Sequence, residues 1–263
     1  MFLLSPQFMA TAHHFSQVTL LITHYNRSRS LQNLLSKFQS MQCSFGDVVV
    51  SDDGSLPVNL KSLKQLQQKF QFKLITSPKN KGLGNNINKG QDAVTTPYTL
   101  YVQEDFEPDA SFSTHFLDAM QFMESEPGLD MVRFYAYLKY PYLENYKNGF
   151  SKMLIKPWYI NYKKIYYYSD HPHVRRSSFF NKFGRYAEGV KGDRTEYRMC
   201  VSFIKNKGKA LFYNDYKALF KQVNPANEPS TMSRNSWTNS NNPLIITIRY
   251  VYRQLRYNFD LLF

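Results

Sequence analysis

Cysteine is scarce in this sequence, which has two among its 263 residues, Cys43 and Cys200. Neither belongs to a C-x-x-C pair, so the sequence predicts neither a zinc site nor a disulfide framework. We therefore expect the protein to reside in a reducing cytoplasm. Long apolar runs are also missing, since no stretch of about 18 residues is apolar enough to predict a membrane-spanning helix. Residues 1–16 lack the basic start of a signal peptide, and we expect them to lead into the first strand.

Two phosphate-binding patterns are absent as well. No G-x-G-x-x-G motif follows the first predicted strand, and no Walker A loop occurs. The segment 81–84 has two glycines, but no Lys-Ser or Lys-Thr pair follows it. The sequence therefore excludes the usual dinucleotide-binding fold and the P-loop.

Charge, in contrast, is strongly one-sided. Lysine and arginine number 33 against 20 acidic residues, which gives a formal net charge of +13. Aromatic residues make up 16% of the chain, including 20 Tyr and 21 Phe. This balance favours an anionic partner, such as a phosphate-bearing substrate, an anionic membrane or a nucleic acid.

The first half alternates apolar runs with amphipathic stretches. Residues 18–23 read VTLLIT, which is typical of a buried strand, and Leu31, Leu34, Leu35 and Phe38 recur at the spacing of one helix face. The alternation predicts strands at 18–23, 47–51, 72–77 and 98–103, and helices at 28–39, 58–70 and 84–93. This order predicts an α/β fold with a mostly parallel sheet flanked by helices.

Polar and charged residues follow each of the four predicted strands. They are Thr23, Tyr25, Asn26 and Arg27, then Asp52 and Asp53, then Asn80 and Lys81, and finally Glu104 and Asp105. Ligands of such sheets bind outside the carboxyl ends of the strands, so we expect these side chains to converge on one pocket. Clustered acid at the end of a buried strand is unfavourable unless a cation neutralises it. Mn²⁺ and Mg²⁺ prefer carboxylate oxygen and share their sites with phosphates, which predicts a metal at Asp105 and Glu104.

Four motifs in this half carry a resemblance through their order and spacing. They are VTLLITHYNRSRSLQNLL, DVVVSDDGS, SPKNKGLGNNINKG and YVQEDFEP. Together they resemble the nucleotide-sugar domain of family 2 glycosyltransferases, which has the GT-A fold. The match covers residues 17–110, and a weaker one covers 169–198, where the family has an acceptor-side segment. The resemblance implies a GT-A-like catalytic domain over 17–222, with a nucleotide-sugar half (17–110) and an acceptor half (111–222).

The resemblance also implies roles for single residues. Thr23 and Tyr25 match positions that line the base, with Tyr25 stacking on it, and Asp53, next to Asp52, matches the acid that reads the uracil edge. Asp105 matches the last acid of a DxD-type motif, which binds the metal bridging the diphosphate. Asp193 matches the general base that deprotonates the acceptor. Glu196 is the second candidate base, since it lies one helical turn further on.

The sequence departs from the family pattern at two places. Ile87 precedes Asn88 where the family often has an arginine. A contact to the base or a phosphate is therefore lost, or it comes from Lys79, Lys81 or Arg27. The acidic motif reads Gln-Glu-Asp in place of Asp-x-Asp. Glutamate gives the motif a longer reach than aspartate and changes the geometry of a bound metal.

The second half is basic and aromatic. Residues 133–186 contain 11 Lys or Arg, two acids and 11 Tyr. This composition suits an acceptor groove, a single-stranded nucleic-acid surface or a half-exposed structural cover. Within it, His171, His173, Arg175 and Arg176 form a second candidate cluster for the acceptor or a phosphate.

The last 41 residues, 223–263, divide into a linker rich in Asn, Ser and Pro and a basic amphipathic helix. Arg249, Arg253 and Arg256 fall at spacings of four and three and share one helix face. The helix is predicted either to lie on an anionic membrane or to pack on the core with its arginines outside.

These observations predict a metal-dependent, inverting glycosyltransferase. It takes a nucleotide-diphosphate sugar, UDP-linked, and transfers the sugar to the hydroxyl of a glycan or lipid-linked acceptor, in the cytoplasm or at the inner face of the membrane. A nucleotidyltransferase acting on sugar phosphates is the alternative enzyme, but residues 24–27 lack its glycine-rich loop. A non-enzymatic nucleic-acid or glycan binding protein would leave Asp53, Glu104, Asp105 and Asp193 unexplained, so a nucleic-acid partner is not expected.

Overall fold

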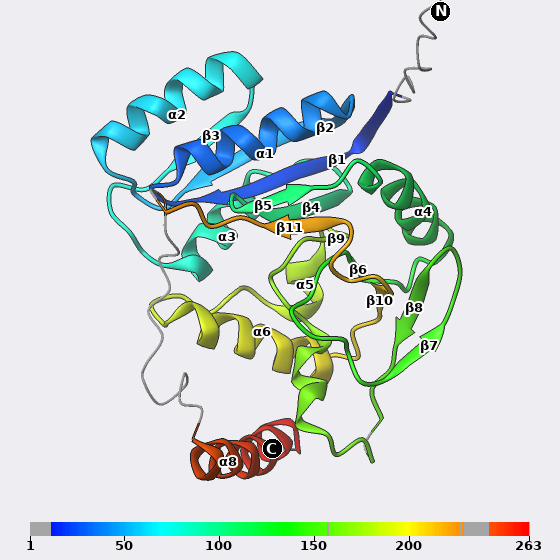
Figure 1. Ribbon diagram of the computed structural model, residues 1–263. Coiled ribbons are helices and arrows are strands. Elements are labelled where there is room, and N and C mark those ends of the chain that lie inside the picture. The colour runs from blue at the N-terminus through cyan, green and yellow to red at the C-terminus, as the bar shows by residue number, and fades with distance from the viewer. Residues whose placement is uncertain (1–11, 157, 227, 229–241, 263) are drawn as a thin grey trace, which may run out of the picture.

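The structure is a computed structural model that describes residues 12–156, 158–226, 228 and 242–262. Its elements are arranged around one sheet (Figure 1). The strands are β1 (His13–His24), β2 (Cys43–Asp52), β3 (Lys73–Thr76), β4 (Tyr98–Gln103), β5 (Phe106–Pro108), β6 (Met131–Arg133), β7 (Leu143–Asn145), β8 (Phe150–Met153), β9 (His173–Arg176), β10 (Ala210–Tyr213) and β11 (Phe220–Gln222). The helices are α1 (Ser28–Ser40), α2 (Pro57–Phe70), α3 (Leu83–Asp92), α4 (Phe112–Ser125), the 3-10 helix η1 (Tyr162–Tyr167), α5 (Phe179–Phe183), α6 (Gly192–Lys205) and α8 (Pro243–Leu262).

Nine of the described strands form the main sheet, in the order β3-β2-β1-β4-β9-β6-β10-β8-β7. The pairs β2–β3, β1–β2 and β1–β4 are all parallel, which confirms the prediction for the first half. β9 then pairs antiparallel with both β4 and β6, so the sheet becomes mixed beyond β4. β11 returns to pair antiparallel with β5 in a separate two-stranded sheet.

β1 begins earlier than its apolar run predicts. Residues 13–15 pair with residues 43–45 of β2 ahead of a register shift, and regular pairing resumes at Thr19. His13, His14 and Ser16 are not apolar, so this extension has no hydrophobic signal in the sequence. It places residues 13–16 in the sheet, and residues 1–11 lie outside the described part of the chain.

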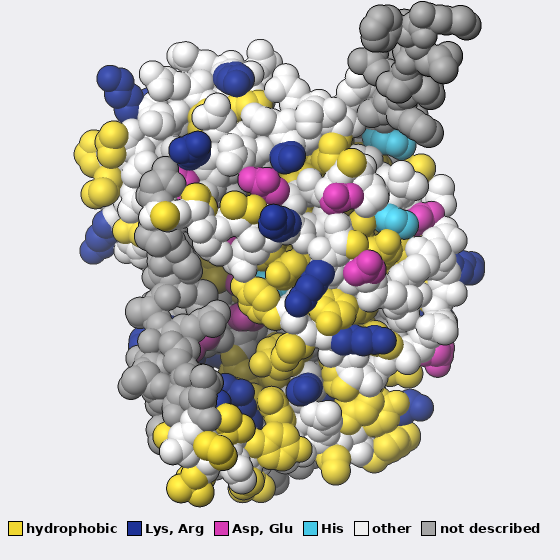
Figure 2. Space-filling view, in the orientation of Figure 1, with side chains coloured by type: hydrophobic (Ala, Val, Ile, Leu, Met, Phe, Trp, Pro, Cys, Tyr) yellow, Lys and Arg dark blue, Asp and Glu magenta, His cyan; other side chains and the backbone are white. Residues whose placement is uncertain are grey.

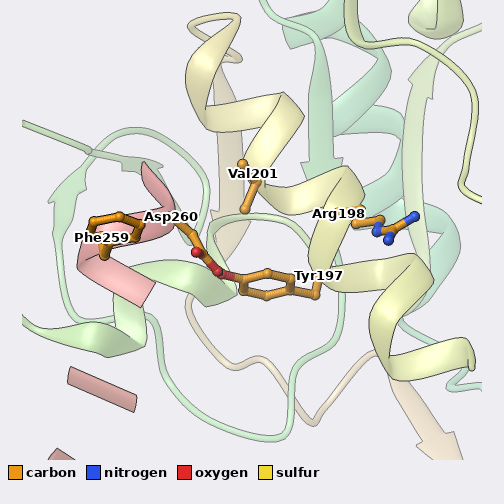
Figure 3. A pocket seen from close by; sticks show the side chains of 5 residues that line it. All are labelled: Tyr197, Arg198, Val201, Phe259 and Asp260. Atoms are coloured by element: carbon orange, nitrogen blue, oxygen red, sulfur yellow. The ribbon is translucent and has the colours of Figure 1, made fainter. Parts of the chain in front are cut away.

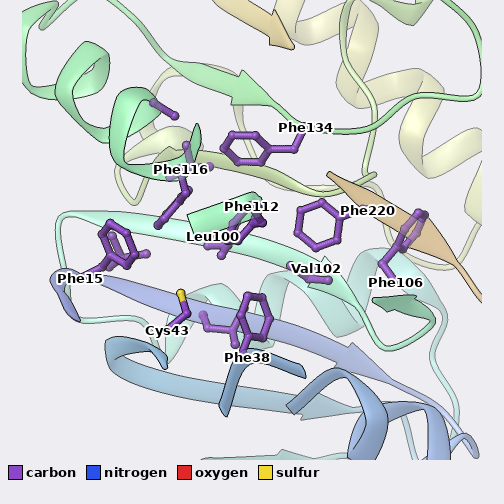
Figure 4. Packing of buried hydrophobic residues seen from close by; sticks show 14 of the residues in the cluster. Phe15, Phe38, Cys43, Leu100, Val102, Phe106, Phe112, Phe116, Phe134 and Phe220 are labelled. Atoms are coloured by element: carbon purple, nitrogen blue, oxygen red, sulfur yellow. The ribbon is translucent and has the colours of Figure 1, made fainter. Parts of the chain in front are cut away.

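Helices cover both faces of the sheet, because its central strands bury side chains on both sides. Leu20 and Ile22 of β1 join a cluster with α1, α2 and α4 (Figure 4), whereas Leu21 points to a second cluster with α3, α5, α6 and η1. This alternation follows from the period-two geometry of a strand. The apolar face predicted for residues 28–39 is confirmed, since Leu31, Leu34, Leu35 and Phe38 are buried.

The order of the strands creates a switch point between β1 and β4. From β1 the chain moves outward through β2 to β3, and it then crosses back to place β4 on the other side of β1. Crevices at such points, outside the carboxyl ends of the strands, are where ligands bind in α/β sheets. The residues that follow β1, β2, β3 and β4 therefore meet at one edge, next to the β5–β11 pair.

The terminal helix α8 packs beside η1 and α6 at the end of the molecule opposite α2 (Figure 1). Across the described residues, no helix combines the length and the hydrophobicity that crossing a bilayer requires. Most of the predicted linker before α8 lies outside the described residues.

Candidate active site

The turn after β2 is built around Asp52. One carboxylate oxygen accepts hydrogen bonds from the Nδ1 of His24 at 2.8 Å and from the Ser55 hydroxyl, and the other accepts from the backbone N–H groups of Gly54 and Ser55 at 3.1 and 3.0 Å. Burial raises the pKa of Asp52, but the hydrogen bonds from His24 and Ser55 outweigh it and hold the pKa below its ordinary value. All of these bonds lie within the turn region, so they give no support to the predicted nucleotide contact of Asp52.

Asp53 joins this turn to the loop after β3. Its two carboxylate oxygens accept from the backbone N–H groups of Lys81 and Gly82 at 2.9 and 2.8 Å. Burial raises its pKa against the opposing effect of these bonds. Gly54 lies at a φ of +72° and would place a Cβ 2.3 Å from the Lys79 backbone, so only glycine allows this approach. The two loops meet as predicted, with the side chains of Asn80 and Lys81 exposed.

The turn after β1 is fixed by Asn26. Its backbone is left-handed, with a φ of +58°, and its side-chain oxygen accepts from Leu56 N–H at 2.8 Å and from the Asn59 amide at 3.2 Å. Thr23 is buried, and its hydroxyl lies 3.0 Å from that of Tyr101. Tyr25 is half-buried at the same edge. The structure therefore brings Thr23, Tyr25 and Asn26 together, with Asn26 shaping the turn.

Glu104 and Asp105 follow β4 and are almost completely buried, at 9% and 5% exposed. One Asp105 oxygen, Oδ2, lies 3.1 Å from the Arg27 guanidinium and accepts from the Gln222 amide at 2.8 Å. The other, Oδ1, is buried without a partner among the described residues. Burial and the neighbouring charge of Asp105 raise the pKa of Glu104 to about 8, although Arg27 opposes the shift from 4.0 Å.

This pair of carboxylates fits a divalent cation. Asp105 Oδ1 is a buried acceptor with unused capacity, and Glu104 lies beside it. No group of three or more His, Cys, Asp or Glu side chains is placed to hold a metal within the described part of the chain. Mg²⁺ and Mn²⁺ are commonly held by one or two carboxylates together with substrate phosphates, and this donor set matches that pattern.

A segment from the far end of the chain closes the edge beside these acids. Arg27 donates to the Val223 carbonyl at 3.3 Å and to the Asn224 side chain at 2.9 Å, and Val223 N–H donates to the Asp105 carbonyl at 2.7 Å. Glu228 accepts from the first N–H groups of α1, those of Arg29 and Ser30, both at 2.9 Å. The carboxylate therefore caps the helix and complements its dipole. No local pattern in the sequence predicts these contacts.

A second group of ionisable side chains lines a small cavity next to this edge. The cavity has a volume of about 110 Å³. Its lining residues are Arg133, Ala136, Tyr137, Leu138, Tyr166, Ser169, His171 and Glu196. Asp170 lies against Glu196, and its backbone N–H donates to Glu196 Oε1 at 3.3 Å.

The electrostatics of this group follow from burial. Burial and the negative charge of Glu196 raise the pKa of Asp170 well above its ordinary range. Burial lowers the pKa of Arg133, and its Nε has no partner among the described residues. Burial and the Arg133 charge lower the pKa of His171 to about 3, so its imidazole is neutral at physiological pH. The cavity region thus combines two neighbouring carboxyl groups, a neutral imidazole and a buried guanidinium.

The cavity adjoins the strand edge. The Gln103 side chain, directly before Glu104, donates to the Asp170 carbonyl at 3.3 Å. The ring of Phe106, directly after Asp105, lies 5.8 Å from the ring of His171. The β4–β5 turn therefore carries the two acids and also contacts Asp170 and His171 beside the cavity. Arg133 and Asp170 were not among the predicted site residues.

Of the two predicted bases, the cavity contains one. Glu196 lines it, whereas Asp193 is exposed in the first turn of α6 and accepts a local hydrogen bond from Arg194 N–H at 2.8 Å. The structure does not bring Asp193 together with the other site residues. Its catalytic role remains a prediction from the family resemblance.

The predicted phosphate role of Arg175 and Arg176 is wrong. β9 runs antiparallel to β4, so Arg176 lies opposite Tyr98 at the start of β4, away from the carboxyl edge. Arg175 is completely buried and donates to Tyr186 and Gln91 at 2.6 and 2.9 Å. Arg176 donates to three backbone carbonyls, which belong to Met123, Glu126 and Leu129.

His173 also lies inside the sheet, completely buried with its ring 5.4 Å from that of Tyr101. Burial lowers its pKa well below the ordinary value, and its Nδ1 donates to the His171 carbonyl at 2.7 Å. Of the four-residue cluster, His171 alone lines the cavity. The surrounding tyrosines are largely structural, since Tyr140 and Tyr167 are buried and donate to backbone carbonyls. This favours the structural cover over a nucleic-acid surface.

Comparison with known proteins agrees with this architecture. The family model described as glycosyl transferase family 2 matches residues 19–187, which is more than half of the chain. The fold is GT-A-like, with a mixed, largely parallel sheet flanked by helices. The chain belongs to glycosyl transferase family 2.

Two curated relatives are 24% identical to the chain. One is the cholesterol galactosyltransferase of Borreliella burgdorferi, matched over 126 residues, 47% of this chain and 34% of the relative. The other is the poly-beta-1,6-N-acetyl-D-glucosamine synthase of Staphylococcus epidermidis, matched over 97 residues, 36% of this chain and 24% of the relative. The chain therefore aligns with about a third and about a quarter of their lengths.

Solved structures share the fold at low identity. S. aureus TarS 1–349 in complex with UDP-GlcNAc superposes with a TM-score of 0.62 at 15% identity, over 93% of this chain and 70% of that one. The mannosyltransferase PcManGT from Pyrobaculum calidifontis, in complex with GDP-Man and Mn²⁺, gives 0.56 at 11% identity, over 80% of this chain and 57% of that one. These likenesses confirm the predicted GT-A-like α/β fold.

Proposed function

We propose that the chain transfers a sugar from a nucleotide-diphosphate donor, UDP-linked, to a hydroxyl of a glycan or lipid-linked acceptor. One observation carries this proposal. A buried carboxylate oxygen without a partner among the described residues, Asp105 Oδ1, lies at the switch-point edge, and a cavity with a carboxyl pair adjoins it. The first site suits a metal-bound diphosphate and the second suits a hydroxyl that must lose its proton.

The donor is proposed to lie across the edge formed by β1, β2 and β4. Tyr25 would stack on the base, with Thr23 beneath, and Asp53 would accept from the uracil N–H while it holds the loop of Asn80 and Lys81. Lys81 and Arg27 supply positive charge for the phosphates. The UDP-GlcNAc bound to the TarS neighbour supports a uridine donor.

A divalent cation would be held by Asp105 through Oδ1 and by Glu104. When bound, it would neutralise the charge of the leaving diphosphate. The Mn²⁺ in PcManGT supports this choice of cation. Arg27 also pairs with Asp105 and holds the 222–224 segment beside it.

Glu196 is proposed as the general base. The acceptor oxygen forms a bond to the anomeric carbon while the bond from that carbon to the diphosphate breaks, and the hydroxyl proton moves to Glu196. Attack opposite the leaving group inverts the anomeric centre. The backbone N–H of Asp170 helps to orient Glu196, and the positive charge of Arg133 lies near the Glu196 carboxyl group.

Calorimetric titration of UDP tests the donor assignment, with GDP for comparison and with or without Mn²⁺. UDP should bind more tightly with Mn²⁺, and Asp105→Ala should lose this gain. Glu107→Ala is the matched control, since it removes the acid two positions further on. Tighter binding of GDP would overturn the uracil assignment, and no binding of either nucleotide in any condition would overturn the proposal.

A further inference from the structure

The terminal helix α8 attaches to the body through polar side chains. Gln254 accepts from Tyr162 N–H at 2.9 Å and donates to the Ile160 carbonyl, to which Asn258 donates at 3.0 Å. Tyr197 of α6 donates to Asp260 at the bottom of a crevice of about 250 Å³ between α6 and α8 (Figure 3). The inner face of this helix thus carries polar side chains, together with Tyr257, whose ring packs beside those of Tyr162 and Tyr197.

The opposite face of α8 is an apolar stripe open to solvent. Its members recur at spacings of four, three and four, and each is about half exposed or more. They are Leu244, Ile248, Val251 and Leu255, at 68%, 47%, 49% and 68%. At 100° per residue, they fall within an arc of about 60°. Arg253 and Tyr257, which are half-buried, lie on the other side, whereas Arg256 is exposed.

A neighbouring loop extends this stripe. Trp158 and Ile160 are each 70% exposed, and the Ile160 carbonyl is bonded to α8. Lys156 lies over the Trp158 ring at 5.4 Å. Figure 2 shows yellow apolar side chains gathered along the end of the molecule where α8 lies, with Lys and Arg among them. A contiguous apolar patch of this kind marks an interaction surface.

Charge identifies the partner. Residues 243–262 contain three arginines and one acid, Asp260, whose carboxylate accepts from Tyr197 and lies 3.7 Å from Arg256. Residues 154–163 add Lys156 and Lys163 and no acid. A second copy of this surface would bring like charges together, whereas an anionic lipid layer complements them. Exposed Trp and Tyr beside Leu, Ile and Phe are typical of a helix at a membrane interface.

We propose that the apolar stripe of α8, with Trp158 and Ile160, docks on an anionic lipid surface. The helix lies parallel to that surface, with the stripe at the boundary between headgroups and acyl chains and the exposed Lys156 and Arg256 at headgroup level. The cavity then opens near the membrane, since η1 packs against α8 and its Tyr166 lines the cavity within range of the Arg253 charge. If the proposed transfer is correct, this position suits a lipid-linked acceptor.

Flotation with phospholipid vesicles tests the docking. Wild type should bind vesicles of phosphatidylcholine with about a third phosphatidylglycerol, and bind phosphatidylcholine alone far less. Ile248→Glu with Leu255→Glu places two charges in the stripe and should weaken binding by roughly tenfold or more. Val58→Glu with Leu117→Glu is the control, because both residues are exposed apolar side chains on α2 and α4, at 68% and 42%. The control should bind like wild type.

Three outcomes would overturn the proposal: no binding of wild type to the anionic vesicles, equal loss in both double variants, or full binding by the stripe variant. Light scattering supplies a fourth, a wild-type dimer that the stripe variant converts to monomer, since a second copy would then cover the stripe. Flotation needs no nucleotide, and UDP titration of the same samples reports on the donor site. Failure of docking is therefore distinguishable from failure of the proposed function.

Discussion

At the strand edge, Asp53 and Asp105 bind to donors that the fold holds in place, whereas beside the cavity Asp170 and Glu196 lie against each other. Backbone N–H groups hold Asp53, and Arg27 and Gln222 hold one oxygen of Asp105. In the cavity, burial and the charge of Glu196 raise the pKa of Asp170 well above its ordinary range.

The difference teaches how one sheet supports two kinds of chemistry. A site whose hydrogen-bond donors are held in place by the fold does not have to reorganise when a ligand of fixed charge binds, which suits a diphosphate. A carboxyl group that lines a small cavity beside a second carboxyl group can accept a proton from a bound hydroxyl, which suits a general base. Substitutions that act on the strand edge and leave the cavity intact, or the reverse, test this division.

The largest effect is expected in the cavity. Glu196→Gln removes the proposed base but keeps the shape of the side chain, so UDP release from a UDP-sugar that supports turnover should fall by roughly 10²–10⁴-fold. UDP affinity should stay near that of wild type, because the residue lies outside the strand edge. Asp193→Asn is the matched control and should change turnover little. The reverse order of the two variants would identify Asp193 as the base and overturn the assignment of Glu196.

Removal of Arg27 should damage the strand edge most. Arg27→Met leaves the buried charge of Asp105 without its cation, since both side chains are 6% exposed. The free energy of unfolding should fall by about 3–5 kcal/mol, as when one partner of a buried ion pair is removed. Mn²⁺ should restore part of the loss by pairing with Asp105, which urea titration with and without the metal would measure.

A surface pair provides the control for Arg27. Arg185 and Asp92 lie 2.7 Å apart but are 50% and 54% exposed. Arg185→Met should therefore cost about 0–1 kcal/mol and show no response to Mn²⁺. Equal losses of unfolding free energy in the two variants would contradict the stabilising role assigned to the buried pair of Arg27 and Asp105.

The pH dependence of stability should reveal the raised pKa of Glu104. Its pKa in the fold is raised from 4.5 to about 8, so it contributes stability below about pH 4.5 that is lost as the pH rises through about 8. In a metal-free buffer, the melting temperature of wild type should fall across this window relative to Glu104→Gln, which has no group to titrate there. Parallel pH profiles for the two proteins would refute the raised pKa.

The smallest effect concerns the contact between the two halves. Gly84 of α3 would place a Cβ 2.2 Å from the Ala187 carbonyl, so Gly84→Ala should push these segments apart at a cost of about 1–3 kcal/mol. Gly128→Ala is the control, because its Cβ would meet nothing nearer than a lysine tip at 3.5 Å. Thermal unfolding of both variants measures the difference, and equal melting temperatures would argue against a tight contact.

The strand edge could be predicted from the sequence because each of its loops follows a parallel strand. The apolar runs located β1 to β4, and parallel order then fixed which ends meet, so Thr23, Asp53, Lys81 and Asp105 converge as expected. Arg175 and Arg176 were predicted from a local cluster of His and Arg, and the structure places neither at this edge. Nothing local indicates that β9 runs antiparallel to β4, and that reversal sends both arginines to the other end of the sheet.

The cavity was harder to predict, since its residues come from irregular segments. Arg133 ends a three-residue strand, and Asp170 stands between η1 and β9 in a stretch without periodicity. Their importance comes from burial next to Glu196, which only tertiary packing creates. Glu228 and Gln222 were missed for a related reason, because their partners are at least 117 positions away along the chain.

Arg27 and Val223, which meet beside Asp105, are 196 positions apart in the chain. During synthesis on the ribosome, Arg27, Asp53 and Asp105 emerge long before β11 does. A nascent chain therefore holds most of the acidic edge but lacks Gln222 and Val223, which complete it. Closing so long a loop is a slow step in folding. We expect nucleotide affinity to appear late in synthesis, after the parallel half of the sheet has formed.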